Sequence, residues 1–261
     1  MITIDQNKGI RVLSLFDGIS CGRVALERAG IPVEKYYASE IDKYAIQVAQ
    51  KNYPDTLQIG DCTKIDYKKY AGEIDLLIGG SPCQGFSFAG KQLNFADPRS
   101  RLFFEFVRAL KEVKPKYFLL ENVKMKKEFQ DIISQQLGIE PIEINSALVS
   151  AQNRKRLYWT NIPNLVLPTD KNIVLKNIAS DAVLAKSKTI RTSGWCSKWG
   201  NKHCFDMPNP YRRFTITELE LLQTLPINYT DGISLTQRRK AIGNGWTVDV
   251  IAHIFKQIPT E

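Results

Sequence analysis

Short apolar runs alternate with helical patterns through the first half of the chain, and this alternation limits the fold more than any other feature. Residues 11–16 (RVLSLF) and 74–78 (IDLLI) have the length and apolarity of strands buried on both faces, whereas residues 102–113 carry apolar side chains at helical spacing. Apolar strands separated by helices indicate a parallel sheet with helices on both faces, which is the α/β class. The same pattern predicts strands over 33–38, 57–60 and 117–120, and helices over 24–29, 44–52, 129–137, 217–222 and 248–258.

Polar and reactive side chains follow the predicted strands at the points where they end. These residues are Asp17, Glu40, Asp61, Ser81–Cys83 and Glu121. The carboxyl ends of parallel strands lie at one edge of the sheet, and ligands bind α/β sheets at that edge. We therefore predict that these side chains form one site.

The net charge of +9 is concentrated in one segment. Residues 154–213 contain 12 Lys or Arg but 3 Asp or Glu, so the rest of the chain is balanced. Clustered cations are what phosphate-backbone binding requires, which favours a polyanion as a partner over a merely solvated basic surface. Beyond Trp159 the strand–helix pattern ends and prolines punctuate the basic stretch, so we predict a small, irregular lobe of short strands and loops. The expected division is a large domain over 1–161 plus 234–261, with a small domain over 162–233; the resemblance described below implies that the large one is the catalytic and cofactor-binding domain and the small one the target-recognition domain, with double-stranded DNA as the polyanion.

The cysteines and the N-terminus indicate a reducing compartment. The five cysteines are odd in number and scattered, as expected of free thiols. No apolar stretch of about 20 residues is present, and residues 1–8 do not resemble a signal peptide. We therefore predict a cytoplasmic protein that has no membrane partner. A zinc module using Cys196, His203 and Cys204 is disfavoured because their spacing is wrong, so we predict no metal.

A glycine-containing turn, residues 15–22 (LFDGISCG), joins the first strand to the first helix. Such a turn lets a cofactor approach the backbone and the helix N-terminus, although a plain tight turn has the same composition. The dinucleotide-binding G-x-G-x-x-G is not present. Glu40 is suited to ribose hydroxyls and Asp61 to an adenine amino group. These features fit S-adenosylmethionine better than NAD.

Three further segments carry groups suited to catalysis. Cys83 lies in GGSPCQGFS (79–87), where Pro82 would present its thiol at a strand end, although most free cysteines are simply buried. Glu121 follows an apolar strand and would be semi-buried, as a proton donor or as a salt-bridged acid. Arg154 and Arg156 alternate as on a strand, so both would face one site or an exposed edge.

These segments, in this order, closely resemble the C5-cytosine DNA methyltransferase family. The prolyl-cysteine motif is matched by residues 81–84, the glutamate motif by 121–123 and the Q-x-R-x-R motif by Gln152, Arg154 and Arg156. Two late motifs are matched by residues 213–226 and 243–248. The turn LFDGI and the segment GGSPC are similar to those of the vertebrate de novo methyltransferases. The resemblance covers nearly the whole chain except about 165–210, and implies a Rossmann-like S-adenosylmethionine-dependent methyltransferase sheet with a small, irregular target-recognition lobe.

The resemblance implies transfer of a methyl group from S-adenosylmethionine to C5 of a flipped-out cytosine, with S-adenosylhomocysteine as product. Cys83 would attack C6, Glu121 would act on N3, and Arg156, with Arg154 nearby, would hold O2. The expected cofactor-binding residues are Phe16, Asp17, Gly18, Ser20, Cys21, Gly22, Glu40, Ile41, Asp61, Cys62, Pro82, Leu102, Asn244 and Trp246. The expected DNA contacts are Ser81, Gln84, Ser87, Arg191, Ser193, Lys198 and Lys202.

Some residues depart from the family pattern. Ser20 and Cys21 replace glycines of the first turn, and Gly245–Trp246 stands where the family often has small or β-branched residues. The short variable segment predicts a short recognition sequence within DNA, and a cognate restriction system is a partner that the resemblance allows. Two alternatives stay open. One is an RNA methyltransferase of the same fold, although such relatives carry two prolines before the cysteine; the other is an inactive DNA-binding paralogue.

Overall fold

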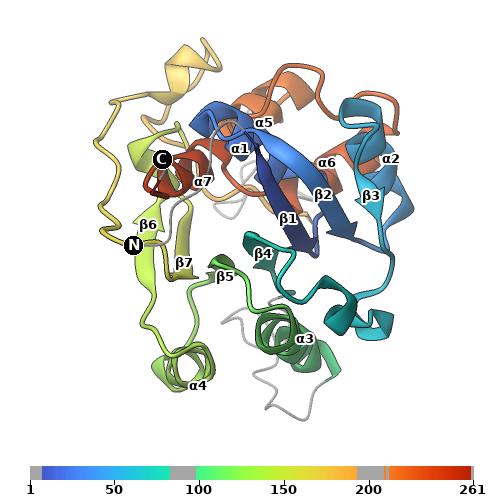
Figure 1. Cartoon of the computed structure of the whole chain (residues 1–261). Coiled ribbons are helices and arrows are strands. Elements are labelled where there is room, and N and C mark those ends of the chain that lie inside the picture. Colours follow the sequence, from blue (N-terminus) through green and yellow to red (C-terminus); the bar gives the residue numbers. More distant parts are fainter. Residues whose placement is uncertain (1–7, 83–97, 193–208, 210–211, 260–261) are drawn as a thin grey trace.

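The computed structural model describes residues 8–82, 98–192, 209 and 212–259, with the main chain alone for 98–101. Seven strands form one sheet in the order β3-β2-β1-β4-β5-β7-β6 (Figure 1). The strands are β1 (Ile10–Leu15), β2 (Val33–Ser39), β3 (Leu57–Gln58), β4 (Leu76–Gly80), β5 (Tyr117–Val123), β6 (Ile142–Asn145) and β7 (Lys155–Thr160). The α-helices are α1 (Cys21–Ala29), α2 (Lys43–Asn52), α3 (Pro98–Val113), α4 (Lys127–Leu137), α5 (Ile216–Leu222), α6 (Leu235–Asn244) and α7 (Val248–Phe255). Short 3-10 helices are η1 (Cys62–Lys64), η2 (Tyr67–Tyr70), η3 (Ser146–Leu148) and η4 (Leu175–Asn177).

The α/β sheet is mixed, which corrects the expectation of a wholly parallel one. Strands β1 to β5 pair in parallel, but β7 runs antiparallel to both β5 and β6. The connection from β6 to β7 contains just the short helix η3, which suffices for antiparallel neighbours, whereas a parallel pair needs a long crossover. The reversal has a functional consequence, because it brings the start of β7 to the edge where β5 ends.

Helices cover both faces of the sheet and divide its core into two layers. Val12 of β1 packs in the cluster that contains α1 and α7, whereas the next residue, Leu13, packs in the cluster that contains α3 and α4. Successive side chains of a strand point to opposite faces, so a run of apolar residues serves both layers. Figure 1 shows α1 and α7 on one side of the sheet and α3 on the other.

Local signals set the first two helices. Gly30 ends α1 in the left-handed conformation (φ 74°), and its N–H donates to the carbonyls of Leu26 and Glu27. The side chain of Asp42 caps α2 by accepting from the N–H of Tyr44. Gly30 therefore ends α1 just before β2 starts, and Asp42 starts α2 just after β2 ends.

A third apolar cluster lies between α5, α6 and the residues that follow β7. Phe214, Leu219 and Leu222 pack there against Ile190 and Ile242. The cluster thus combines residues from both sides of the expected boundary at 233/234, and the division into two domains stays a prediction. No helix in the part of the chain that the structure describes is both long and apolar enough to cross a membrane.

Candidate active site

The turn after β1 is held from within by Asp17. Its carboxylate accepts hydrogen bonds from the hydroxyls of Ser14 (2.6 Å), Ser20 (2.5 Å) and Tyr36 (2.7 Å). Phe16 and Ser20 both adopt a φ of 57°, which residues other than glycine rarely do. Desolvation raises the pKa of the Asp17 carboxyl. Asp17 therefore shapes the turn in which we expected it to bind cofactor.

Glu40, at the end of β2, joins that turn to α2. One carboxylate oxygen accepts from the N–H of Gly18 (2.8 Å), and the other accepts from the N–H groups of Ile41 (2.7 Å) and Asp42 (2.8 Å). A carboxylate has about four lone-pair sites, so these bonds leave acceptor capacity for a ribose hydroxyl. Ile41 is 77% exposed and offers an apolar surface beside it. Glu40 thus offers a hydrogen-bond acceptor next to an exposed apolar side chain at the carboxyl edge of the sheet.

Asp61 and Cys62 follow β3 at the same edge. The Asp61 carboxylate accepts from the N–H and the hydroxyl of Thr63, and these hydrogen bonds lower its pKa. The thiols of Cys62 and Cys21 are buried, and burial raises the pKa of each to about 12. Neither thiol is suited to nucleophilic attack, and cofactor contacts of these two residues would fall to the main chain.

Glu121 is the buried acid of the site. It pairs with Gly80 across β4 and β5, and it is 8% exposed. The Nε of Arg156, on the antiparallel strand β7, lies 3.0 Å from one carboxylate oxygen. The indole Nε1 of Trp246 donates to the other oxygen at 3.1 Å. Both oxygens are thus held by donors from two distant segments of the chain.

Asn122 connects Glu121 to the segment that carries the prolyl-cysteine motif. Its side-chain amide donates to the hydroxyl of Ser81 at 3.0 Å, and its own oxygen accepts from the N–H of Val123. Ser81 is 5% exposed. Ser81 thus links the end of β4 to β5, and the DNA contact that we expected of it stays a prediction.

Arg154 does not occupy the position beside Glu121 that the alternation with Arg156 predicts. Its guanidinium donates to the carbonyls of Ile190 (3.1 Å), Gly245 (2.9 Å) and Gly243 (3.4 Å), and the residue is 4% exposed. Burial lowers the Arg154 pKa to about 9. Because Arg154 precedes β7, the strand alternation does not apply to it.

A buried polar network that the sequence did not reveal supports the late motif. The Gln223 side-chain amide donates to the carbonyls of Ile242 (2.9 Å) and Gly245 (3.0 Å), and its oxygen accepts from Thr247 and Gln152. These bonds fix the segment between α6 and α7, on which Trp246 lies. The Q-x-R-x-R motif was the one sequence signal that marked Gln152 as important. Its partner Gln223 lies 71 residues away in the sequence, so the motif did not reveal the hydrogen bond between them.

Of the other expected site residues, some are described by the structure and some are not. Pro82, Leu102 and Gly22 lie half-buried or buried near the same edge, and Asn244 and Arg191 are exposed. The rest lie outside the described residues: Cys83, Gln84, Ser87, Ser193, Lys198 and Lys202. Within the described ranges no group of His, Cys, Asp and Glu side chains is arranged to hold a metal ion.

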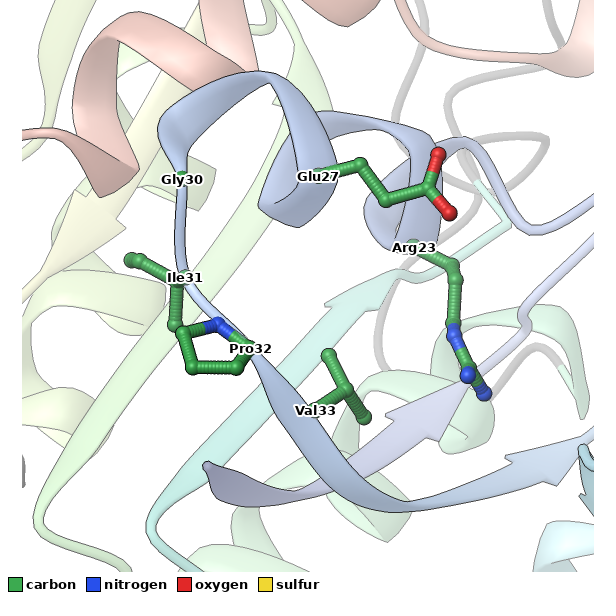
Figure 2. A pocket seen from close by; sticks show the side chains of 6 residues that line it. All are labelled: Arg23, Glu27, Gly30, Ile31, Pro32 and Val33. Carbon is green, nitrogen blue, oxygen red and sulfur yellow. The ribbon is translucent and has the colours of Figure 1, made fainter. Parts of the chain in front are cut away.

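A surface pocket lies away from this edge. It is lined by Arg23 and Glu27 of α1 and by 30–33, the link from α1 into the start of β2 (Figure 2). The start of β2 is at the amino edge of the parallel strands, whereas Glu40 and Glu121 are at the carboxyl edge. The pocket is therefore separate from the candidate active site.

Comparison with known proteins agrees with this geometry. The family model of C-5 cytosine-specific DNA methylases matches residues 10–172 and 124–260. The chain belongs to this family. It is 41% identical over 305 residues to type II methyltransferase M1.ScrFI of Lactococcus lactis subsp. cremoris, which covers 95% of this chain and 77% of that protein.

Two further matches set limits on the likeness. Orphan methyltransferase M.Rho11sI of Bacillus phage rho11s is 39% identical over 192 residues, covering 69% of this chain, and the chain spans 38% of that relative's length. The solved structure of the Entamoeba histolytica methyltransferase EhMeth has a TM-score of 0.74 and 19% identity, covering 96% of this chain and 98% of that one. The second likeness concerns the fold, which is the Rossmann-like methyltransferase sheet that the sequence predicted.

Proposed function

We propose that this protein transfers a methyl group from S-adenosylmethionine to C5 of cytosine in double-stranded DNA. The observation that carries the proposal is Glu121, a buried carboxylate held by Arg156 and Trp246 beside the end of β4. A protonated carboxyl group can donate to N3 of cytosine and a guanidinium can donate to O2, so Glu121 and Arg156 together complement these two acceptors. A base stacked in a duplex cannot enter such a buried site, so the cytosine must be flipped out.

In the proposed reaction Cys83, placed by its motif directly after Ser81–Pro82, adds as thiolate to C6 of the base. The S–C6 bond forms while the C5–C6 π pair moves toward C5, and protonated Glu121 donates its proton to N3 as negative charge builds on the ring. Arg156 holds the base at O2 and Glu121 in place. After C5 is methylated it loses its proton to solvent water, the C5–C6 double bond returns, the Cys83 thiolate leaves and the N3 proton returns to Glu121.

The cofactor supplies an electrophilic methyl group on a sulfonium. We propose that Glu40 accepts hydrogen bonds from its ribose, that Asp61 accepts one from its adenine amino group, and that Phe16 and Ile41 flank the adenine. Support comes from the acceptor capacity of Glu40 and from the exposure of Ile41 beside it. Gly18 also contributes, because its N–H orients the Glu40 carboxylate.

The direct test uses purified protein, labelled S-adenosylmethionine, random-sequence duplex DNA and, in parallel, tRNA. We expect label in DNA, and no label with the Cys83→Ala variant. Label in tRNA alone would retain the chemistry and refute the substrate. DNA binding with no label in either nucleic acid would favour the inactive paralogue. Sequencing that maps the methylated cytosines then tests whether the recognition sequence is short. A site of six or more base pairs, roughly the length that two zinc fingers read, would contradict that expectation.

The biological setting follows from the relatives. They come from bacteria and phages and are named as orphan or type II methyltransferases. We propose that this protein acts on DNA in the bacterial cytoplasm, with a cognate restriction system as a partner to be sought beside its gene. Co-expression with a candidate restriction enzyme, followed by digestion of the host DNA, tests that partnership.

A further inference from the structure

Trp246 lies between the cofactor turn and the catalytic acid. An ideal Cβ built on Gly22, at the start of α1, would be 3.5 Å from the six-membered ring of Trp246. A Cβ built on Gly80, at the end of β4, would be 2.8 Å from its Nε1 and 3.2 Å from a Glu121 carboxylate oxygen. The indole therefore lies between the two glycines, and a side chain at Gly80 would displace it.

The main chain around Trp246 is held independently of its ring. The Gly245 carbonyl accepts from Arg154 (2.9 Å) and from Gln223 (3.0 Å). Buried networks in which each member is satisfied are rigid. The position of the indole N–H is consequently set before any ligand enters.

We propose that Trp246 is a positioning residue for Glu121, in addition to the cofactor contact that its motif implies. This inference rests on the proposed function. Arg156 restrains one carboxylate oxygen and Trp246 the other, so the plane of the carboxylate is fixed. A carboxylate held by one donor can rotate, and loss of orientation slows reactions that require an aligned group. The family often has a small or β-branched residue here, which has no N–H to offer.

The test separates the action on Glu121 from contact with the cofactor. Without cofactor, the enzyme should release tritium from [5-³H]cytosine DNA: sulfur bonds to C6, C5 takes a proton from water and loses tritium to water, and the S–C6 bond breaks. Loss of one hydrogen bond to a charged group costs enough free energy that we expect Trp246→Phe to slow this exchange about tenfold. Single-turnover methylation at saturating cofactor should fall by the same factor, with DNA affinity unchanged.

The matched control is Trp159→Phe, which removes an indole N–H that donates to Ser134 at 3.0 Å in the core of the sheet. It should lower stability and leave the exchange rate at the wild-type value. If Trp246→Phe does not fold, 3-benzothienylalanine at position 246 keeps the ring shape and lacks the N–H, and should give the same loss. Wild-type exchange with weakened cofactor binding would overturn the proposal. Absence of exchange and methylation in the wild-type protein would instead refute the proposed function.

Discussion

Replacing Arg154 and Arg156 separately by lysine should affect different properties of the protein. Arg154 is buried and its guanidinium donates to the carbonyls of Ile190 and Gly245 on either side of it. Lysine keeps the charge, but a single ammonium lacks the planar fork that serves both carbonyls. Arg156 lies beside Glu121, where lysine still supplies a cation.

The size of the stability loss follows from the partners that remain. Gly245 keeps a hydrogen bond from Gln223, so losing Arg154 there costs about 0.5–1.5 kcal/mol. Loss of the donor to the Ile190 carbonyl, which is buried with Arg154, costs about 1–3 kcal/mol. We therefore expect Arg154→Lys to lower the free energy of unfolding by about 2–4 kcal/mol, and Arg156→Lys to lower it by no more than about 1 kcal/mol.

The two variants should also differ in activity. Arg156→Lys should lower the single-turnover rate of methylation about tenfold or more, because it removes the guanidinium that pairs with Glu121 and that we propose holds the base. Arg154→Lys should lower the single-turnover rate only slightly despite its larger loss in the free energy of unfolding, when the assay temperature keeps the variant folded. Urea unfolding and single-turnover labelling measure both. A wild-type unfolding free energy for Arg154→Lys together with a large rate loss would refute this reasoning and place Arg154 in direct contact with substrate.

Two further predictions concern the turn after β1 and the end of β4. Desolvation raises the pKa of Asp17 above its ordinary value of 3.8. Between these two pKa values the folded protein binds more protons than the unfolded chain, so the free energy of unfolding falls as the pH rises through this range. Asp17→Asn should therefore lose stability less steeply than wild type as pH rises, in urea unfolding series; parallel curves would contradict it. Asn122→Asp removes the amide that donates to the Ser81 hydroxyl, which anchors the prolyl-cysteine segment. We expect the single-turnover rate to fall about tenfold while DNA affinity is unchanged. A wild-type rate would show that this hydrogen bond does not position the segment.

The strands and their polar ends could be predicted because burial on both faces leaves a plain signal. A strand such as β4 must be apolar at every position, and the residue at its end is free to be polar. Helix α6 was missed because its sequence, LTQRRKAIGN, has little apolar periodicity and buries Ile242 and Gly243 near its end. Strand β6 was missed because four residues at a sheet edge are too short to show alternation.

Contacts across the site were beyond the sequence for a different reason. The pattern placed Glu121 and Arg156 in one motif set, and the structure brings them to 3.0 Å because β7 reverses direction beside β5. Trp246 was identified through its motif alone, as a cofactor contact. Its bond to Glu121 depends on Gly80, because a Cβ at that position would be 2.8 Å from the indole Nε1. Gly80 is not informative until the fold brings it beside Trp246.

The Q-x-R-x-R motif therefore combines two kinds of requirement that a sequence pattern cannot separate. Arg156 forms an ion pair with Glu121, whereas Arg154 donates to the Gly245 carbonyl and Gln152 to the Leu222 carbonyl, both in the late motifs. Arg154 also joins the carbonyl of Ile190, within the basic segment, to that of Gly245, next to Trp246. One motif thus connects the basic segment to the residue that we propose positions Glu121. An invariant spacing is the expected consequence, since a shift of either arginine would break contacts on both sides.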